Sequence, residues 1–148
     1  MRDKGPWSPE QIDQFLAQVR VPIRLACNGA SGHPVLASLW FLPLEGQLWC
    51  ATQRTARIVS HLRRDPRCAF EVAEERAPYR GVRGQGIASM HDARGASVLR
   101  SLVERYLADP SSGFARWLLA RAEHETAIAI APQTRLSWDY RQRMGDAA

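Results

Sequence analysis

"HPVLASLWFLPLEGQLWCAT" (residues 33–52) is the stretch that decides the fold class. It contains two apolar runs of strand length, residues 33–44 and 47–52, joined by the short turn "PLEG" (43–46). A third run, "PIRLACN" (22–28), precedes them and alternates around apolar residues. Short turns between such runs are typical of neighbouring antiparallel strands. We therefore expect these three strands to form a meander.

Further strands follow along the chain. Residues 67–73 and 82–90 read as strands four and five, and "TAIAIAP" (126–132) as the sixth. Gly84 and Gly86 within the fifth run indicate a bulge or a close backbone approach. Because the strands mostly follow one another without crossover helices, Rossmann and TIM-barrel layouts are excluded. A small antiparallel barrel decorated by helices is favoured.

Four helices accompany the strands. Ser8 followed by Pro9 is a typical helix start, and the apolar spacing extends an N-terminal helix over residues 8–20. A short amphipathic helix follows the third strand. Asp92 is placed to cap a long helix, which is followed by a shorter one within a helical insertion over residues 92–122.

The length of 148 residues fits a single domain. Its parts are the N-terminal helix, a barrel over about residues 21–132 that contains the insertion, and a C-terminal tail over residues 133–148. The predicted fold class is mainly β with helices (α+β), built on a six-stranded antiparallel barrel.

Composition limits the classes of function. The chain is 45% hydrophobic and 24% charged, as in soluble globular proteins. It has no apolar run of membrane-span length and no signal-peptide core at its start, so we expect a cytoplasmic location and no membrane partner. The net charge of +5 is dispersed among acids, which argues against nucleic-acid binding. The three cysteines and four histidines match no metal-binding spacing, and no metal site is predicted.

The stretch "ATQRTARIVSHLRRDPR" (51–67) carries the most suggestive chemistry. Thr52, Arg54, Thr55 and Arg57 stand at the start of the short helix, with Thr55 placed as its N-cap. Hydroxyls, backbone N–H groups and positive charge at a helix start form an anion site, and Arg57 opposes the helix dipole unless an anion is bound. The same residues also fit a solvated surface helix with a threonine cap.

Candidate catalytic residues are not identified. The sequence shows no nucleophile beside a base and no carboxylate pair at a defined spacing. If the protein is an enzyme, a cofactor is expected to supply the reactive group.

The order of these segments resembles the pyridoxamine 5′-phosphate oxidase-like, FMN-binding split-barrel superfamily. The likeness extends from about residue 20 to 140, and its more specific parts are "RRDPR" (63–67) and "SWDY" (137–140). The resemblance implies a six-stranded split β-barrel that forms a homodimer with FMN at the subunit interface.

The resemblance also implies a set of cofactor-binding residues. The strand whose backbone lies along the flavin ring contains Ala37, Ser38 and Leu39. The strand end that meets the flavin and the ribityl phosphate contains Ala51 and Thr52, and the phosphate-binding turn contains Thr55 and Arg57. The tryptophan that reaches the cofactor across the dimer is Trp138.

The activity implied is that of an FMN-dependent oxidoreductase, which transfers a hydride through flavin N5 to or from an unknown small molecule. Two departures argue against the vitamin B6 reaction itself. The C-terminal arginine–histidine pair that grips the pyridoxal substrate is missing, and Gly81 stands where a glutamine contacts flavin in true oxidases. The alternative is a non-catalytic protein that binds or carries a flavin, the deazaflavin F420 or haem.

Overall fold

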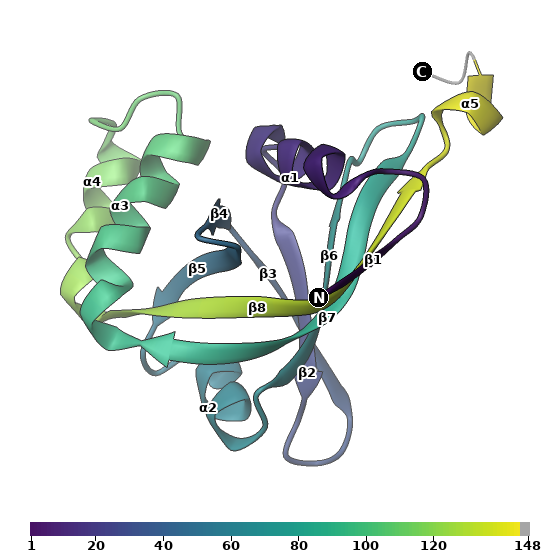
Figure 1. Ribbon diagram of the computed structural model, residues 1–148. Helices are drawn as coiled ribbons and strands as arrows, with labels where there is room; N and C mark the ends of the chain where they lie inside the picture. Colours follow the sequence, from purple (N-terminus) through teal and green to yellow (C-terminus); the bar gives the residue numbers. More distant parts are fainter. Residues whose placement is uncertain (146–148) are drawn as a thin grey trace.

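The computed structural model describes residues 1–145, which form one strongly curved sheet surrounded by helices (Figure 1). The strands are β1 (Arg2–Lys4), β2 (Ile23–Asn28), β3 (Pro34–Leu39), β4 (Leu42–Leu44), β5 (Gln47–Gln53), β6 (Arg67–Ala73), β7 (Arg80–His91) and β8 (Glu125–Asp139). The helices are α1 (Pro9–Gln18), α2 (Arg57–Arg64), α3 (Gly95–Tyr106), α4 (Gly113–Leu119) and α5 (Arg141–Met144), with the 3₁₀ turns η1 (Asp92–Arg94) and η2 (Ala122–His124).

The sheet is mainly antiparallel and open along one side. Its strand order is β3-β2-β6-β7-β8-β5-β4, and β1 adds a short parallel pairing to β8. In the described part of the chain, the two ends of this order do not pair with each other, so the barrel is split. The predicted class is confirmed, although the sheet has eight strands where six were expected.

The prediction of a single strand over residues 33–44 and of a three-strand meander is wrong. β3 pairs with β2 and β4 pairs with β5, so the two hairpins lie at opposite ends of the sheet order. The chain bends at Trp40 and Phe41 between β3 and β4. Phe41 is fully buried, and the Tyr106 hydroxyl accepts from its backbone N–H at 3.3 Å. A buried aromatic and a satisfied backbone thus stabilise a bend that the apolar run does not reveal.

β8 is much longer than the predicted strand over residues 126–132. It continues to Asp139 and pairs along β7, with Gly81 opposite Trp138. The expected tail over residues 133–148 is therefore a strand in its first half, and Trp138 belongs to the sheet. Residues 146–148 lie outside the described residues. A register shift between Gln85 and Gly86 confirms the bulge predicted from the glycines.

The helix starts differ from prediction in two places. α1 begins as expected, with a capping box between Ser8 and Gln11, and ends at Gln18 rather than residue 20. Asp92 begins the 3₁₀ turn η1 and is not the N-cap of α3, because that position is taken by Arg94. α2 begins at Arg57, but its N-cap is Ala56 and not Thr55.

The main core fills the inside of the split barrel. Side chains of α1 and α2 both join it, and these helices cover opposite ends of the curved sheet (Figure 1). α3 and α4 pack together against the outer face of β5 and β8, over Trp49 and Ala129. No helix within residues 1–145 has the length and apolar character needed to cross a membrane. The cytoplasmic location stays a prediction.

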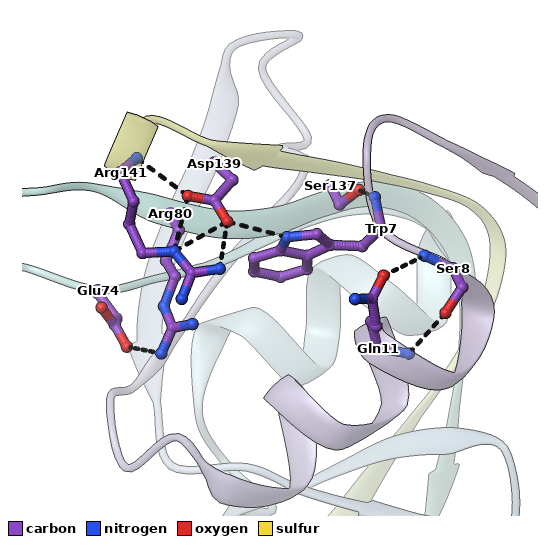
Figure 2. A network of polar contacts seen from close by, with 8 residues as sticks. All are labelled: Trp7, Ser8, Gln11, Glu74, Arg80, Ser137, Asp139 and Arg141. Atoms are coloured by element: carbon purple, nitrogen blue, oxygen red, sulfur yellow. Dashed lines mark hydrogen bonds and ion pairs between the residues drawn. The ribbon is translucent and has the colours of Figure 1, made fainter. Parts of the chain in front are cut away.

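A polar network ties the N-terminal segment to the end of β8 (Figure 2). Trp7 Nε1 donates to Asp139 Oδ2 at 3.1 Å, and Arg141 binds both oxygens of the same carboxylate. Nearby, Arg80 donates to Glu74 at 2.9 Å. The polar groups of this end of the molecule are thus largely paired with one another.

Candidate functional site

The open side of the barrel is a seam between two strand edges. Among residues 1–145, β3 pairs only with β2, and β5 pairs with β4 only through residues 47–49. One edge of β3, around Ser38, and the β4-side edge of β5, around Ala51, therefore carry backbone N–H and C=O groups outside the ladders. Such edges offer a row of donors and acceptors to a ligand that enters the seam.

A groove of about 360 Å³ lies at this seam, beneath α3 and α4. It brings together four of the eight predicted site residues, namely Ser38, Leu39, Ala51 and Thr52. The rest of the lining comes from the strand ends and the two helices: Trp40, Gln53, Leu99, Leu102, Phe114, Leu118, Arg121 and Glu125. The site is thus apolar along the helices and polar where β5 ends.

Polar groups without partners gather at the β5 end of the groove. Gln53 and Glu125 face each other across the β5–β8 ladder, and Glu125 is only 7% exposed. The Gln53 Nε2 and Glu125 Oε2 atoms are shielded from solvent and have no hydrogen-bond partner within the described chain. Burial raises the pKa of the Glu125 carboxyl, while the neighbouring Gln53 amide and Arg121 charge oppose part of that rise.

Thr126, next to Glu125, is also fully buried, but successive residues of a strand face opposite sides of the sheet, so its hydroxyl points away from the groove and toward Asp92. Buried polar atoms of native proteins are nearly all hydrogen-bonded, so the two unpaired atoms at the groove, Gln53 Nε2 and Glu125 Oε2, require an explanation. A site that a ligand completes is one such explanation.

The outer wall of the groove comes from α4 and the turn after it. Phe114 and Trp117 are more than half exposed, and their rings stack at 6.1 Å between centroids. The Arg121 guanidinium lies 4.7 Å from the Trp117 ring centroid, within cation–π range. This contact holds a positive charge at the mouth of the groove.

The start of α2 lies one turn beyond the β5 end of the groove. Its N-cap, Ala56, gives no side-chain hydrogen bond, and its first turn contains no acid. Arg57 occupies the first helical position, where a cation opposes the helix dipole. The predicted hydroxyl cap is therefore wrong, because the Ala56 backbone adopts the extended conformation that Thr55 was expected to provide. The correction leaves the first N–H groups of α2 more open to an anion than predicted.

One internal anion lies near this region. The Asp92 carboxylate is 3.9 Å from Arg54 Nε and 3.4 Å from Arg63 Nη2. A hydrogen bond from Thr126, followed by these two arginines, lowers the pKa of Asp92. Both arginine contacts are long and half-exposed, so they are weak ion pairs. Arg57 takes part in no ion pair in the described part of the molecule.

The other four predicted residues do not line the groove: Thr55 and Arg57 lie at the start of α2, and Ala37 and Trp138 lie elsewhere. Ala37 packs toward the barrel core. Trp138 lies over Gly81, where an added Cβ would come within 2.8 Å of its ring. It is 13 positions after Glu125 on β8, or about 40 Å of extended chain. Within one chain Trp138 therefore belongs to the opposite end of the strand, and only a second copy could bring it to this groove.

The sequence reading missed Gln53, Arg121 and Glu125. Each has an ordinary local context: a strand end, a turn between helices, and the residue before an apolar strand. The only available signal was the acid directly before "TAIAIAP", which places a carboxyl at the mouth of a buried strand.

Comparison with known protein families matches residues 8–138 to the pyridoxamine 5′-phosphate oxidase family. The match covers most of the sequence, and the chain belongs to this family. No protein of curated function matches the sequence.

Solved structures share the fold over most of their lengths. The conserved hypothetical protein Rv2991 from Mycobacterium tuberculosis is 25% identical, with a TM-score of 0.79 and coverage of 93% of this chain and 88% of the other. An F420 reductase is 19% identical (TM-score 0.70; 86% and 98% covered). The haem storage protein HutZ from Vibrio cholerae is 17% identical (0.65; 90% and 92%), and a FAD-binding protein from Mesorhizobium loti 18% (0.64; 88% and 93%). Proteins of this fold therefore include one described as FAD-binding, one described as an F420 reductase and one described as a haem storage protein.

Proposed function

This chain belongs to the pyridoxamine 5′-phosphate oxidase family, and we propose that it is an FMN-binding oxidoreductase that transfers a hydride to or from a small molecule. The observation that carries the proposal is the uncapped start of α2. It is led by Arg57 and lies at one end of an open seam between unpaired strand edges. FMN consists of an anionic phosphate and a flat polar ring joined by a short chain. The phosphate matches the start of α2, and the ring matches the seam.

The phosphate of FMN fits the start of α2. Its first-turn N–H groups have no side-chain cap within the described residues, and Arg57 adds a charge that is unfavourable without an anion. Thr55 is exposed beside it and supplies a hydroxyl donor. Charge-assisted hydrogen bonds of this kind contribute roughly 1.5–3 kcal/mol each.

The flavin ring fits the seam. The backbone beside Ser38 and Leu39 and the end of β5 at Ala51 and Thr52 offer donors and acceptors to the polar edge of the ring. Ala51 is small enough to allow a flat ring to approach the strand. Leu99 and Leu102 exclude water from the helical side of the groove.

Bound FMN supplies the hydride chemistry at its N5 atom. The chain's own residues bind the phosphate, orient the ring and shape the space left for the substrate. No acid–base residue is assigned to the reaction.

The groove favours a flavin or deazaflavin over haem. Its lining within residues 1–145 includes no histidine, cysteine, methionine or tyrosine that could bind iron. F420 carries the same kind of phosphorylated chain as FMN, so it remains the alternative cofactor. A carrier that binds the cofactor without turnover remains the alternative function.

The second half of the proposal is a homodimer. A hollow of about 590 Å³ on the face of β2, β6, β7 and β8 is bordered by Leu36, which is 70% exposed, and by Leu136. Its floor consists of the small residues Ala26, Ala69 and Gly84. The lining also includes the charged residues Arg24, Glu71 and Arg83, and a mixed face of this kind with an exposed leucine suits a second copy. In such a dimer the partner's Trp138 would reach the cofactor, as the family resemblance implies.

The test is a fluorescence titration of the apoprotein with FMN. Arg57→Ala should weaken FMN binding at least tenfold and, because it removes a cation from the first turn of α2, should not lower the free energy of unfolding of the apoprotein. Arg100→Ala, an exposed arginine on α3, is the matched control and should leave the affinity unchanged. Equal affinities of Arg57→Ala and wild type would refute the phosphate site. Anaerobic bleaching of the bound flavin by NAD(P)H would then separate an oxidoreductase from a carrier.

A further inference from the structure

Glu125 is a buried acid whose polar neighbours, the Gln53 amide and Arg121, only partly offset the cost of its burial. It is the first residue of β8 and lines the groove beside Gln53. Its Oε2 is shielded from solvent and unpaired in residues 1–145. An unpaired carboxyl at this depth costs more than a neutral polar group would, and proteins retain such groups mainly where a ligand or a reaction uses them.

The position of Glu125 is fixed by backbone packing. A Cβ on Gly95 would lie 2.1 Å from the Glu125 carbonyl oxygen, so only glycine lets the start of α3 approach β8 this closely. The Arg54 N–H donates to the His124 carbonyl at 3.0 Å, which joins the phosphate-side turn to the residue before Glu125. The backbone of Glu125 is therefore held beside the turn that leads into α2.

The order of features along the groove indicates what meets this acid. Along the chain, Gln53 lies between the groove residues Ala51 and Thr52 and the α2 start at Arg57, and Glu125 is its cross-strand neighbour. If FMN binds as proposed above, its phosphate and ring occupy those two positions. The chain between them then passes Glu125.

We propose that Glu125 accepts hydrogen bonds from the hydroxyl groups of the cofactor's ribityl chain, with Gln53 as its neighbour at the same end of the groove. The inference rests on the proposed function and deepens it. It means that the site recognises the polyhydroxylated chain of its cofactor, which FMN and F420 carry and haem does not. Rotation of a carboxyl group about its last side-chain bond is nearly free, so either oxygen can turn toward the groove.

The test compares FMN with an analogue that keeps the ring and the phosphate but has an unsubstituted five-carbon alkyl chain. Both are titrated into wild type, Glu125→Leu and Glu125→Gln. Wild type should bind the analogue at least tenfold more weakly than FMN. Glu125→Leu should lose at least tenfold in FMN affinity and show less than a threefold preference between the ligands. Glu125→Gln keeps a carbonyl acceptor and should retain part of the preference.

Glu123→Leu is the matched control, because Glu123 is exposed on η2 two residues earlier. It should retain the wild-type preference for FMN. Equal binding of FMN and the analogue by wild type would overturn the inference even if Glu125→Leu failed to fold. It would leave the phosphate site intact, provided that Arg57→Ala still weakened both ligands. An unchanged preference in a folded Glu125→Leu protein would also overturn it.

Discussion

The helix α1 begins with a serine whose hydroxyl accepts from the Gln11 backbone, whereas α2 begins at Ala56 without a side-chain cap. The first turn of α1 contains Glu10, and that of α2 contains Arg57 and no acid. The same contrast separates the two ends of the molecule. Both carboxylate oxygens of Asp139 at the N-terminal network accept hydrogen bonds (Figure 2), while the Glu125 Oε2 atom at the groove has no hydrogen-bond partner in the described residues. In residues 1–145 the network around Asp139 is largely paired internally, apart from Arg80 Nε and Trp138 Nε1, whereas the groove end combines an uncapped helix start with an unpaired carboxylate oxygen, which the proposed cofactor would complete.

The largest predicted effect is on the free energy of unfolding, through the ion pairs of Arg135 with the N-terminal segment. Arg135 is 6% exposed and donates to Asp3 at 2.9 and 2.7 Å, and it also pairs with Asp13. Arg135→Met should lower the free energy of unfolding by about 3 kcal/mol, because it removes the buried partner of the partly buried Asp3 carboxylate. Urea unfolding measures the loss. FMN affinity of the folded variant should stay within threefold of wild type, and a tenfold loss of affinity would break the proposed separation of the two ends.

The second prediction gives α2 the features of α1. Ala56 has the extended backbone of an N-cap, so Ala56→Asp should cap the helix and raise the free energy of unfolding of the apoprotein by about 1 kcal/mol. The new carboxylate should occupy the anion position and weaken FMN binding at least tenfold. Unfolding and flavin titrations measure the two effects. Ala56→Ser adds a cap without charge and should reduce affinity less. A stabilised variant with undiminished FMN affinity would contradict the phosphate site.

Local features of the fold were predictable from sequence, and long-range ones were not. β2 and β6 match the alternating runs closely, and the start of α1 follows from Ser8 and Pro9. The pairing of β3 and β5 was predicted wrongly, because short turns indicate neighbours in sequence and the bend at Phe41 separates them in space.

The end of β8 was missed for a different reason. Its inward-facing residues there are Arg135 and Ser137, which read as polar tail but are buried against the N-terminal segment. At the site, the start of α2 was visible in the threonines and arginines. The unpaired Glu125 Oε2 atom could not be predicted, because its lack of a hydrogen-bond partner appears only when β5, β8 and α3 are assembled.

The third prediction concerns the cap of α1 alone. Ser8→Ala removes the hydroxyl that accepts from the Gln11 N–H at 3.2 Å and should lower the free energy of unfolding by about 1 kcal/mol. FMN affinity should not change, since α1 lies at the other end of the barrel. Thermal unfolding with and without FMN measures both. A change in the stabilisation conferred by saturating FMN would show that the two helix starts are coupled.

The smallest predicted effect is a pH dependence of the network in Figure 2. The hydrogen bond from Arg141 lowers the pKa of Asp139 from 3.8 to about 2, with a further contribution from Trp7. Because the folded-state pKa is depressed, the stabilisation is present above about pH 4 and is lost as the pH falls through about 2. Arg141 is half-exposed, so solvent screening keeps the effect small. Asp139→Asn should be less stable than wild type at pH 6, and the difference should shrink between pH 4 and 2. A difference that stayed constant over that range would show that Asp139 acts through packing of Trp7 rather than through its charge.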